Sequence, residues 1–321
     1  MENTVREQLL KTLGESIPKK QLMEYAPMSR YTTLKLGGPA EVLCEVTNAE
    51  EIRAALTAAN GLDVPVTLIG NGSNLLVKDG GVRGLVVHIG DGFSQISAPV
   101  PLPDGRFALT AQGGARLTKL SNAAADAGLA GMEFAAGIPG TVGGAVYMNA
   151  GAYGGEMKDV VTNVTACEMD GRIVSYNNEE MAFGYRHSAL IDAGRPVAVT
   201  SVTVALEKGD EDTIRTAMRE FNARRREKQP VTLPGCGSTF KRPEGHFAGT
   251  LIDQCGLKGL RIGGASVSTL HAGFLVNDQQ GTAADYLALM AEVQRIVLEK
   301  TGVQLEPEVR IIGEDAPATG I

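Results

Sequence analysis

Apolar residues recur at helical spacing at several places along the chain. Near the start they lie three and four positions apart among charged residues, which predicts an amphipathic helix within residues 1–17. Later stretches carry end signals as well: Asn48 is suited to an N-cap, and Thr282 with Asp285 forms a capping-box pattern. Helices are therefore also predicted at residues 48–59, 116–127, 211–228, 247–255 and 282–301.

Short apolar runs bounded by turn residues predict strands between these helices. Asp170-Gly171 lies between two such runs and predicts a hairpin. The last run places Leu305, Val309 and Ile311 on one face of a strand. The predicted strands are residues 40–46, 64–69, 75–77, 84–89, 160–168, 172–176, 197–206, 261–267, 272–276 and 305–312.

A length of 321 residues and this order of elements predict two domains in an α+β fold. The first, residues 1–208, is rich in strands and contains the N-terminal helix at 1–17. It divides around two glycine loops into subdomains at about 24–90 and 91–208. The second domain, residues 209–321, begins with a long helix and mixes helices with strands.

The two glycine-rich loops are the strongest candidates for a ligand site. Residues 137–155 are rich in glycine and have no charged side chain, and residues 70–74 form a second loop. Bare backbone amides can cradle the phosphate oxygens of a dinucleotide. The alternative is that the glycines only allow tight turns to pack between strands.

The loop at residues 70–74 departs from the common nucleotide motifs. No helix is predicted directly behind it, and it lacks both the third glycine of the Rossmann fingerprint and the Gly-Lys-Ser/Thr of the P-loop. We therefore expect loop amides to hold the phosphates, with donors from Asn71, Ser73 and Asn74. The predicted cofactor-binding residues are Gly70, Asn71, Gly72, Ser73, Asn74, Gly137, Ile138, Gly140, Thr141, Gly143 and Gly144.

The amino-acid composition indicates which kinds of binding partner and which cellular compartment to expect. A net charge of −7 leaves no basic surplus for nucleic acid or anionic lipid, so neither partner is expected. The start of the chain lacks the apolar run of a signal peptide, and no stretch is apolar enough to span a membrane. The four cysteines are far apart and form no zinc or thiol-redox motif, which favours a reduced cytoplasmic compartment and no metal site.

Five motifs in a fixed order give the chain a resemblance to a known family. They lie at residues 70–74, 137–144, 184–186, 237–243 and 306–310. With them the chain resembles the UDP-N-acetylenolpyruvoylglucosamine reductases over roughly residues 31–313, in the shorter form that lacks an additional tyrosine loop. The resemblance implies a two-part FAD-binding domain of the vanillyl-alcohol-oxidase type followed by an α/β substrate-binding domain. It also implies NADPH-dependent reduction of UDP-N-acetylglucosamine enolpyruvate in peptidoglycan precursor synthesis, with non-covalent FAD.

The resemblance also assigns roles to particular residues. Arg186 is the fixed cation for the charge that develops on the substrate carboxylate, and Ser238 donates the proton to the α-carbon. Glu308 is expected to act in its protonated form, because an ionised carboxylate would oppose the enolate. Tyr185 and Lys228 are implied to bind substrate.

Each of these residues also has an ordinary structural interpretation. An arginine after a tyrosine is commonly a surface ion-pair partner, a serine after Gly237 commonly caps a turn, and Glu308 could pair with Arg310 across a strand face. Cys236 stands where many relatives have alanine, which places a thiol near a redox site.

Two other functions remain open at this point. One is a flavoenzyme of the same fold that oxidises a small hydroxy acid or alcohol. Many such enzymes tether flavin through histidine, and neither glycine loop contains one. The other is a flavin-free module that binds a nucleotide sugar and senses precursor supply. A flavin spectrum of the purified protein separates the two classes.

Overall fold

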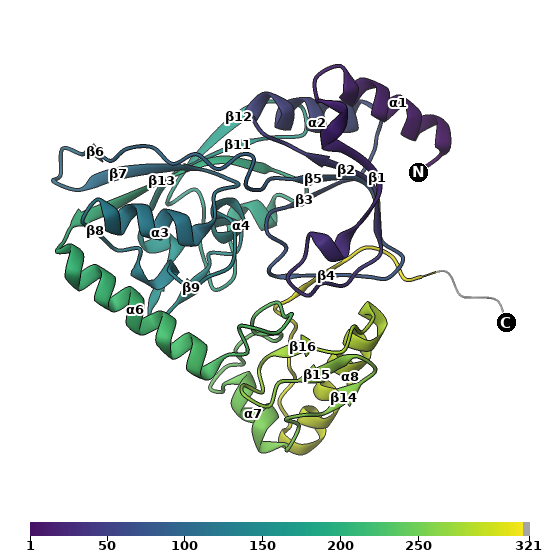
Figure 1. The fold of residues 1–321 in the computed structure, drawn as a ribbon, viewed down its shortest axis with the longest axis vertical. Coiled ribbons are helices and arrows are strands. Elements are labelled where there is room, and N and C mark those ends of the chain that lie inside the picture. Colours follow the sequence, from purple (N-terminus) through teal and green to yellow (C-terminus); the bar gives the residue numbers. More distant parts are fainter. Residues whose placement is uncertain (317–321) are drawn as a thin grey trace. The chain divides into compact units, whose positions relative to one another are not determined.

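The computed structural model describes residues 1–316 and has a mixed α/β fold (Figure 1). The chain forms two compact units. Unit 1 comprises Met1–Glu24, Val42–Asn71 and Gly84–Arg224, and unit 2 comprises Tyr25–Glu41, Gly72–Arg83 and the chain from Arg225 onward. The domain boundary predicted between residues 208 and 209 lies inside unit 1, between a strand and a helix, and stays a prediction.

A small sheet and two helices form one end of unit 1. The sheet has the order β1-β2-β5-β3, and β3 pairs with β5 in parallel. The predicted strand, helix, strand order is present, because α2 connects β2 to β3 and the Asn48 side chain caps α2 by accepting from the Glu51 amide at 2.9 Å. The elements are α1 (Asn3–Gly14), β1 (Leu22–Pro27), β2 (Pro39–Glu45), α2 (Ala49–Gly61), β3 (Val66–Ile69) and β5 (Val82–His88).

An antiparallel sheet carries the main core of unit 1. Its strand order is β12-β11-β13-β7-β6, and β8 pairs with the end of β13. The predicted hairpin around Asp170-Gly171 is confirmed, since β11 pairs with β12. The elements are β6 (Val100–Pro101), β7 (Phe107–Gln112), α3 (Leu117–Asp126), β8 (Leu129–Ala130), β11 (Val161–Cys167), β12 (Ile173–Asn177), α5 (Ala189–Asp192), β13 (Ala198–Lys208) and α6 (Glu211–Lys228).

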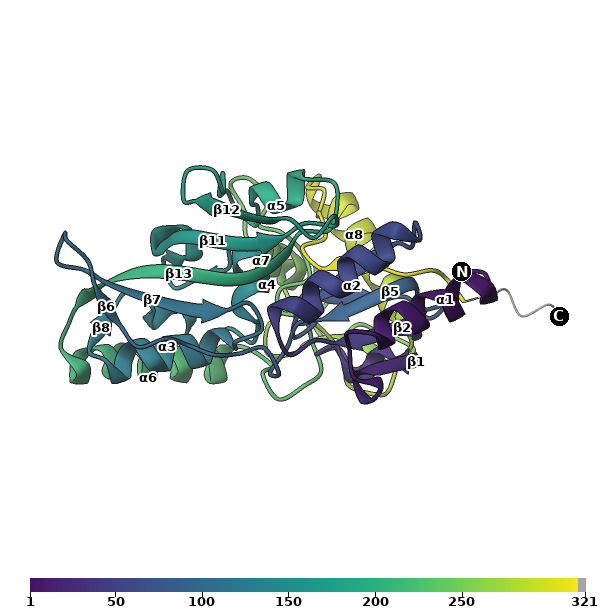
Figure 2. The same cartoon turned by 90° about the horizontal axis from the view of Figure 1, so that it is seen from above.

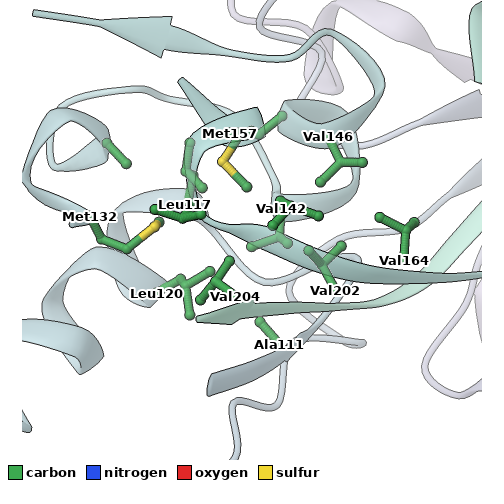
Figure 3. Packing of buried hydrophobic residues seen from close by; sticks show 14 of the residues in the cluster. Ala111, Leu117, Leu120, Met132, Val142, Val146, Met157, Val164, Val202 and Val204 are labelled. Carbon is green, nitrogen blue, oxygen red and sulfur yellow. The ribbon is translucent and has the colours of Figure 1, made fainter. Parts of the chain in front are cut away.

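Helices α3 and α4 (Val142–Tyr147) cover this sheet with apolar side chains. In Figure 3, Leu117 and Leu120 of α3 lie against Val202 and Val204 of β13, with Val142 of α4 beside them. All five side chains are buried. Seen from above, α3 and α6 lie on the same side of the sheet (Figure 2), and their buried side chains share one small apolar cluster.

The central glycine stretch contains more regular structure than its sequence suggests. Its middle forms the short helix α4 (Val142–Tyr147), capped by the Thr141 hydroxyl, which accepts from the Gly144 amide at 3.3 Å. A two-stranded ribbon follows, formed by β9 (Gly151–Ala152) and β10 (Gly155–Glu156). Apolar burial of α4 against β13 outweighs the low helix propensity of its glycines.

Unit 2 contains a three-stranded sheet, β14-β15-β16, and a parallel pair formed by β4 and β17. Helix α8 begins with the predicted capping box, both halves of which are present, and ends at Gly302 in the left-handed conformation. The elements are β4 (Leu75–Val77), α7 (Ala248–Gln254), β14 (Arg261–Ile262), β15 (Ala265–Val267), β16 (Leu275–Asn277), α8 (Ala283–Thr301) and β17 (Arg310–Ile312).

Two strand predictions in unit 2 are wrong in extent. Residues 261–267 form two strands, because the chain turns at Gly263 with a φ of +52°. At the end of the chain only residues 310–312 are a strand; Leu305 and Val309 are buried, but Ile311 is 39% exposed. The chain before β17 instead bonds to irregular backbone elsewhere in unit 2.

Single turns of 3₁₀ helix complete the structure at Lys19–Gln21, Met28–Arg30, Glu133–Ala135 and Met157–Asp159. Within residues 1–316, no helix combines the length and the apolar character that crossing a membrane requires. The four cysteines are all buried and free.

Candidate active site

Within unit 1, Gly70 and Asn71 of the first glycine loop contact the second loop, whereas Gly72, Ser73 and Asn74 belong to unit 2. The Asn71 side-chain amide donates to the Pro139 carbonyl, which ties the first loop to the second. A Cβ atom added to Gly70 would lie 2.2 Å from the Thr141 hydroxyl oxygen. Gly70 is therefore required by protein packing, as the structural alternative proposed.

Several polar groups of these loops have no protein partner. The amides of Asn71, Gly140 and Thr141 donate to none of the residues 1–316. In unit 2 the buried Thr33 hydroxyl also lacks a hydrogen-bond partner among the described residues, and the Thr33 amide donates to the Gly72 carbonyl at 3.3 Å. A buried hydroxyl without a partner costs about 1–3 kcal/mol. Donors of this kind fit the phosphates and polar ring edge of a flavin dinucleotide.

Thr33 could not be identified as a functional residue from the sequence. It lies in the Thr32-Thr33 pair just before a glycine turn, a pattern that is equally common in ordinary loops. What marks Thr33 is a buried hydroxyl without a hydrogen-bond partner among residues 1–316, and this can be seen only in the structure.

Gly72 is fixed by the backbone of unit 2, and its substitution gives a first prediction. Its φ is +57°, and a Cβ atom would lie 2.0 Å from the Tyr31 carbonyl oxygen. Gly72→Ala is expected to lower the free energy of unfolding by about 3 kcal/mol or more, since steric overlap adds to left-handed strain. Urea unfolding followed by circular dichroism measures it.

Gly256→Ala is the matched control for Gly72→Ala. Gly256 has a φ of +75° but nothing within 4 Å of its Cβ position, so this variant has the backbone strain without the overlap. Its loss of stability is expected to be about 1–2 kcal/mol. Equal losses in the two variants would contradict the packing explanation.

Arg186 lies in a tight turn of unit 1 that buried polar groups hold. The Gly184 and His187 backbones exchange hydrogen bonds of 3.1 and 3.2 Å, and Arg186 between them has a φ of +54°. The buried Asn149 side chain donates to the Gly184 carbonyl at 2.9 Å. On the other side of the turn, the Ser188 hydroxyl donates to a neighbouring carbonyl at 2.7 Å. Hydrogen bonds at Gly184 and Ser188 thus fix the chain before and after Arg186, which keeps its left-handed backbone conformation.

The structure brings Tyr185 and Arg186 together. The Arg186 guanidinium carbon lies 5.0 Å from the centre of the Tyr185 ring, a cation–π distance. Tyr185 is 52% exposed, so the pair presents an aromatic face and a planar cation at the surface of unit 1. This arrangement suits an anionic group that also carries an apolar part.

Three predicted segments meet in unit 2. The Asn74 side chain donates to the Glu308 carbonyl at 3.1 Å, and the Arg310 amide donates to the Asn74 carbonyl at 3.0 Å. The Glu308 amide in turn donates to the Thr239 carbonyl at 2.8 Å. Glu308 is therefore hydrogen-bonded through its backbone both to the Asn74 side chain and to Thr239, the residue after Ser238, although the three lie far apart in the sequence.

The Ser238 hydroxyl is available for chemistry. The side chain is half-buried, and its oxygen makes no hydrogen bond to any of residues 1–316. The turn-capping interpretation of this serine therefore has no hydrogen bond in its support. Glu308 is half-buried, and Lys228 is the exposed last residue of α6. Ser238, Glu308 and Lys228 belong to unit 2, whereas Tyr185 and Arg186 belong to unit 1.

The thiol of Cys236 is buried close to Ser238 in the sequence. Burial raises the pKa of Cys236 to about 11, so the thiol is protonated at neutral pH. A protonated, buried thiol is a poor nucleophile. This cysteine therefore behaves as a small core residue.

Thiol labelling tests this interpretation. Native protein is expected to react slowly with an aromatic disulfide reagent at about pH 7.5, and all four cysteines are expected to react once urea unfolds the chain. The absorbance of the released thiolate measures both rates. A fast-reacting thiol in native protein that disappears in Cys236→Ala would contradict it.

Comparison with known proteins connects these features. An FAD binding domain model matches residues 40–177, and a model of the C-terminal domain of UDP-N-acetylenolpyruvoylglucosamine reductase matches residues 229–312. The reductase of Levilactobacillus brevis is 46% identical over 96% of this chain and 98% of its own length. That of Limosilactobacillus fermentum is 47% identical over 96% and 99%. The chain belongs to the UDP-N-acetylenolpyruvoylglucosamine reductase family.

The fold agrees with this membership. The crystal structure of the reductase from Thermus caldophilus superimposes with a TM-score of 0.75 at 37% identity, covering 89% of this chain and 97% of that one. The fold prediction is therefore confirmed: an FAD-binding domain of the vanillyl-alcohol-oxidase type precedes the C-terminal domain of the family. Both glycine loops lie in the first match, and Ser238 and Glu308 in the second.

Proposed function

We propose that this reductase converts UDP-N-acetylglucosamine enolpyruvate to UDP-N-acetylmuramate in peptidoglycan precursor synthesis, with NADPH as the reductant. The observation that carries the proposal is the junction in unit 2, where Glu308 is hydrogen-bonded to both Asn74 and Thr239. It links three of the five motifs of the family. FAD, held by the amides of the two glycine loops, would supply the hydride chemistry that links NADPH to the terminal carbon of the enolpyruvyl C=C bond.

Arg186 is proposed to stabilise the charge of this reaction. Hydride addition leaves an enolate whose negative charge spreads over the substrate carboxylate. A guanidinium meets a carboxylate with two parallel N–H groups, and a cation fixed before the reaction needs no reorganisation in the transition state. The turn that holds Arg186 in a left-handed conformation and the Tyr185 ring beneath it supply that fixation.

Ser238 is proposed to complete the reduction with a proton. Its Oγ–H donates to the α-carbon, so hydride and proton together saturate the C=C bond. A serine hydroxyl is a weak acid, but an enolate carbon is a strong base, and transfer is favourable within hydrogen-bond reach. Ser238 Oγ has no hydrogen-bond partner among residues 1–316, which leaves this hydroxyl free to face substrate. The serine then regains a proton from solvent.

Glu308 and Lys228 are proposed to support the same substrate. In its protonated form, Glu308 donates a hydrogen bond toward the enolate and adds no negative charge there. Its backbone is fixed by bonds from Asn74 and to Thr239. Lys228, exposed at the end of α6, and Tyr185 are proposed to contact the substrate away from the reacting carbons.

The decisive experiment is an NADPH oxidation assay on the purified flavoprotein. UDP-N-acetylglucosamine enolpyruvate is expected to stimulate the loss of absorbance at 340 nm, and small hydroxy acids are not. A protein without a flavin spectrum would favour the nucleotide-sugar sensor. Flavin reduction by a hydroxy acid would favour an oxidase of the same fold.

A further inference from the structure

We infer that Tyr286 is a positioning residue that sets the geometry of Ser238 and Glu308 through Thr239. This inference rests on the proposed function, because it concerns the two groups that face the substrate carbon. Tyr286 lies on α8, outside all five motifs, and its hydroxyl bonds to Cys236, Thr239 and Leu275 rather than to Ser238 or Glu308.

The phenol of Tyr286 is the centre of a closed hydrogen-bond network. Tyr286 and Thr239 are both completely buried. The Tyr286 hydroxyl lies 3.2 Å from the Leu275 carbonyl, 3.1 Å from the Thr239 hydroxyl and 3.3 Å from the Cys236 sulfur. The Leu275 amide donates back to the Thr239 hydroxyl at 3.1 Å.

These contacts fix the direction of each proton. The Leu275 carbonyl can only accept, so the single phenolic proton points to it. The phenolic oxygen then accepts from both Thr239 and Cys236, which uses its two lone pairs. Every polar group in the network is satisfied, and each group has one arrangement only. A network of this kind rigidifies its surroundings.

Thr239 transmits this rigidity to the proposed catalytic groups. It follows Ser238 directly in the chain, so its buried side chain anchors the backbone that carries the serine hydroxyl. Its carbonyl accepts from the Glu308 amide at 2.8 Å, and its amide donates to the Gly273 carbonyl at 2.9 Å. The Tyr286 phenol thus holds the one residue to which both Ser238 and Glu308 are attached.

The network does not act as a proton relay. It ends on a peptide carbonyl, which has no proton to release, and all its side chains are closed to solvent. Burial also raises the pKa of Tyr286 well above its ordinary value, which keeps the phenol protonated. Positioning is the function that remains, and a displacement of about 1 Å in a reacting group can cost about 10²-fold in rate.

The test separates the two half-reactions of Tyr286→Phe by stopped flow. Reoxidation of the reduced flavoprotein by enolpyruvyl substrate is expected to slow about tenfold or more, because Thr239, Cys236 and the Leu275 carbonyl each lose a partner. Reduction of the flavin by NADPH is expected to stay within about twofold of wild type, since it needs no proton from Ser238. Hydrogen exchange without substrate is expected to quicken at the Leu275 and Glu308 amides.

Three further variants make the result specific. Thr239→Val, which removes the other hydroxyl, is expected to match Tyr286→Phe, and the double variant is expected to be no slower than either, because both break one network. Thr239→Ser retains the hydroxyl and is expected to restore the wild-type rate. Thr282→Ala removes the cap of the same helix without touching the network, and it is expected to lower stability while leaving the ratio of the two half-reactions unchanged.

Two results would overturn the inference. One is an equal slowing of both half-reactions in Tyr286→Phe, which indicates general loosening. The other is unchanged exchange at the Glu308 amide together with unchanged reoxidation. Failure of the proposed function looks different: wild-type protein would show no reoxidation by the substrate at all. The exchange of Glu308 would still decide whether Tyr286 holds the junction.

Discussion

Replacement of Ser238 with alanine is expected to lower substrate turnover by about 10²–10⁴-fold. The variant retains Arg186 and Glu308, so hydride addition remains possible, but the α-carbon must then take its proton from solvent. Because the Ser238 hydroxyl has no hydrogen bond to residues 1–316, its loss leaves no protein group unpaired, and the melting temperature is expected to change little. Steady-state NADPH oxidation and stopped-flow flavin reduction measure the effect, and the latter is expected to stay at the wild-type rate.

A second serine of unit 2 controls for the loss of a hydroxyl as such. Ser268 is buried and its hydroxyl accepts from the Leu270 and His271 amides at 3.2 and 3.4 Å. Ser268→Ala is therefore expected to destabilise the protein more than Ser238→Ala but to retain turnover. If the two variants show the opposite pattern, Ser238 is a turn residue and the proton comes from another group.

Local signals explain which parts of the fold the sequence predicts. Helix α8 was predicted with its start and its end because Thr282, Asp285 and Gly302 act within a few residues of one another. The prediction for the last strand is too long because the Glu308 and Val309 amides donate to the carbonyl of Thr239, which lies near in space but remote in sequence. Alternation of apolar residues cannot distinguish a strand from an extended segment of this kind.

The candidate site shows the same difference between local sequence motifs and contacts between residues that are remote in sequence. The order of the motifs predicts roles for Arg186, Ser238 and Glu308, since each lies within a short and recognisable stretch. It could not identify Tyr286, whose partner Thr239 lies 47 positions away. The sequence also could not decide whether the glycines serve ligand binding or tight packing. The structure has features of both, because Gly70 is required by packing and the nearby amides of Asn71, Gly140 and Thr141 have no acceptor among residues 1–316.

Arg186→Lys is expected to lower turnover by about 10²–10³-fold, the usual cost of removing a preorganised donor from a developing oxyanion. Lysine keeps the positive charge but loses the planar pair of N–H groups and the flat stacking surface on Tyr185. Since the charge develops during the reaction, most of the loss is expected in kcat and a smaller part in KM. Steady-state kinetics with enolpyruvyl substrate over a range of concentrations measure the two separately.

Stability measurements then separate a chemical role of Arg186 from a structural one. The left-handed φ of +54° costs about 1–2 kcal/mol for a residue with a Cβ atom, and lysine retains this strain. Arg186→Gly relieves it, so this variant is expected to unfold at equal or higher urea concentration than wild type while losing more activity than Arg186→Lys. Arg172→Lys, at an exposed arginine paired with the buried Glu168, provides the matched control and is expected to retain turnover. If Arg186→Gly turns over at the wild-type rate, the Arg186 cation has no catalytic role. If Arg186→Gly is more stable but less active than wild type, the backbone strain at Arg186 is retained for function.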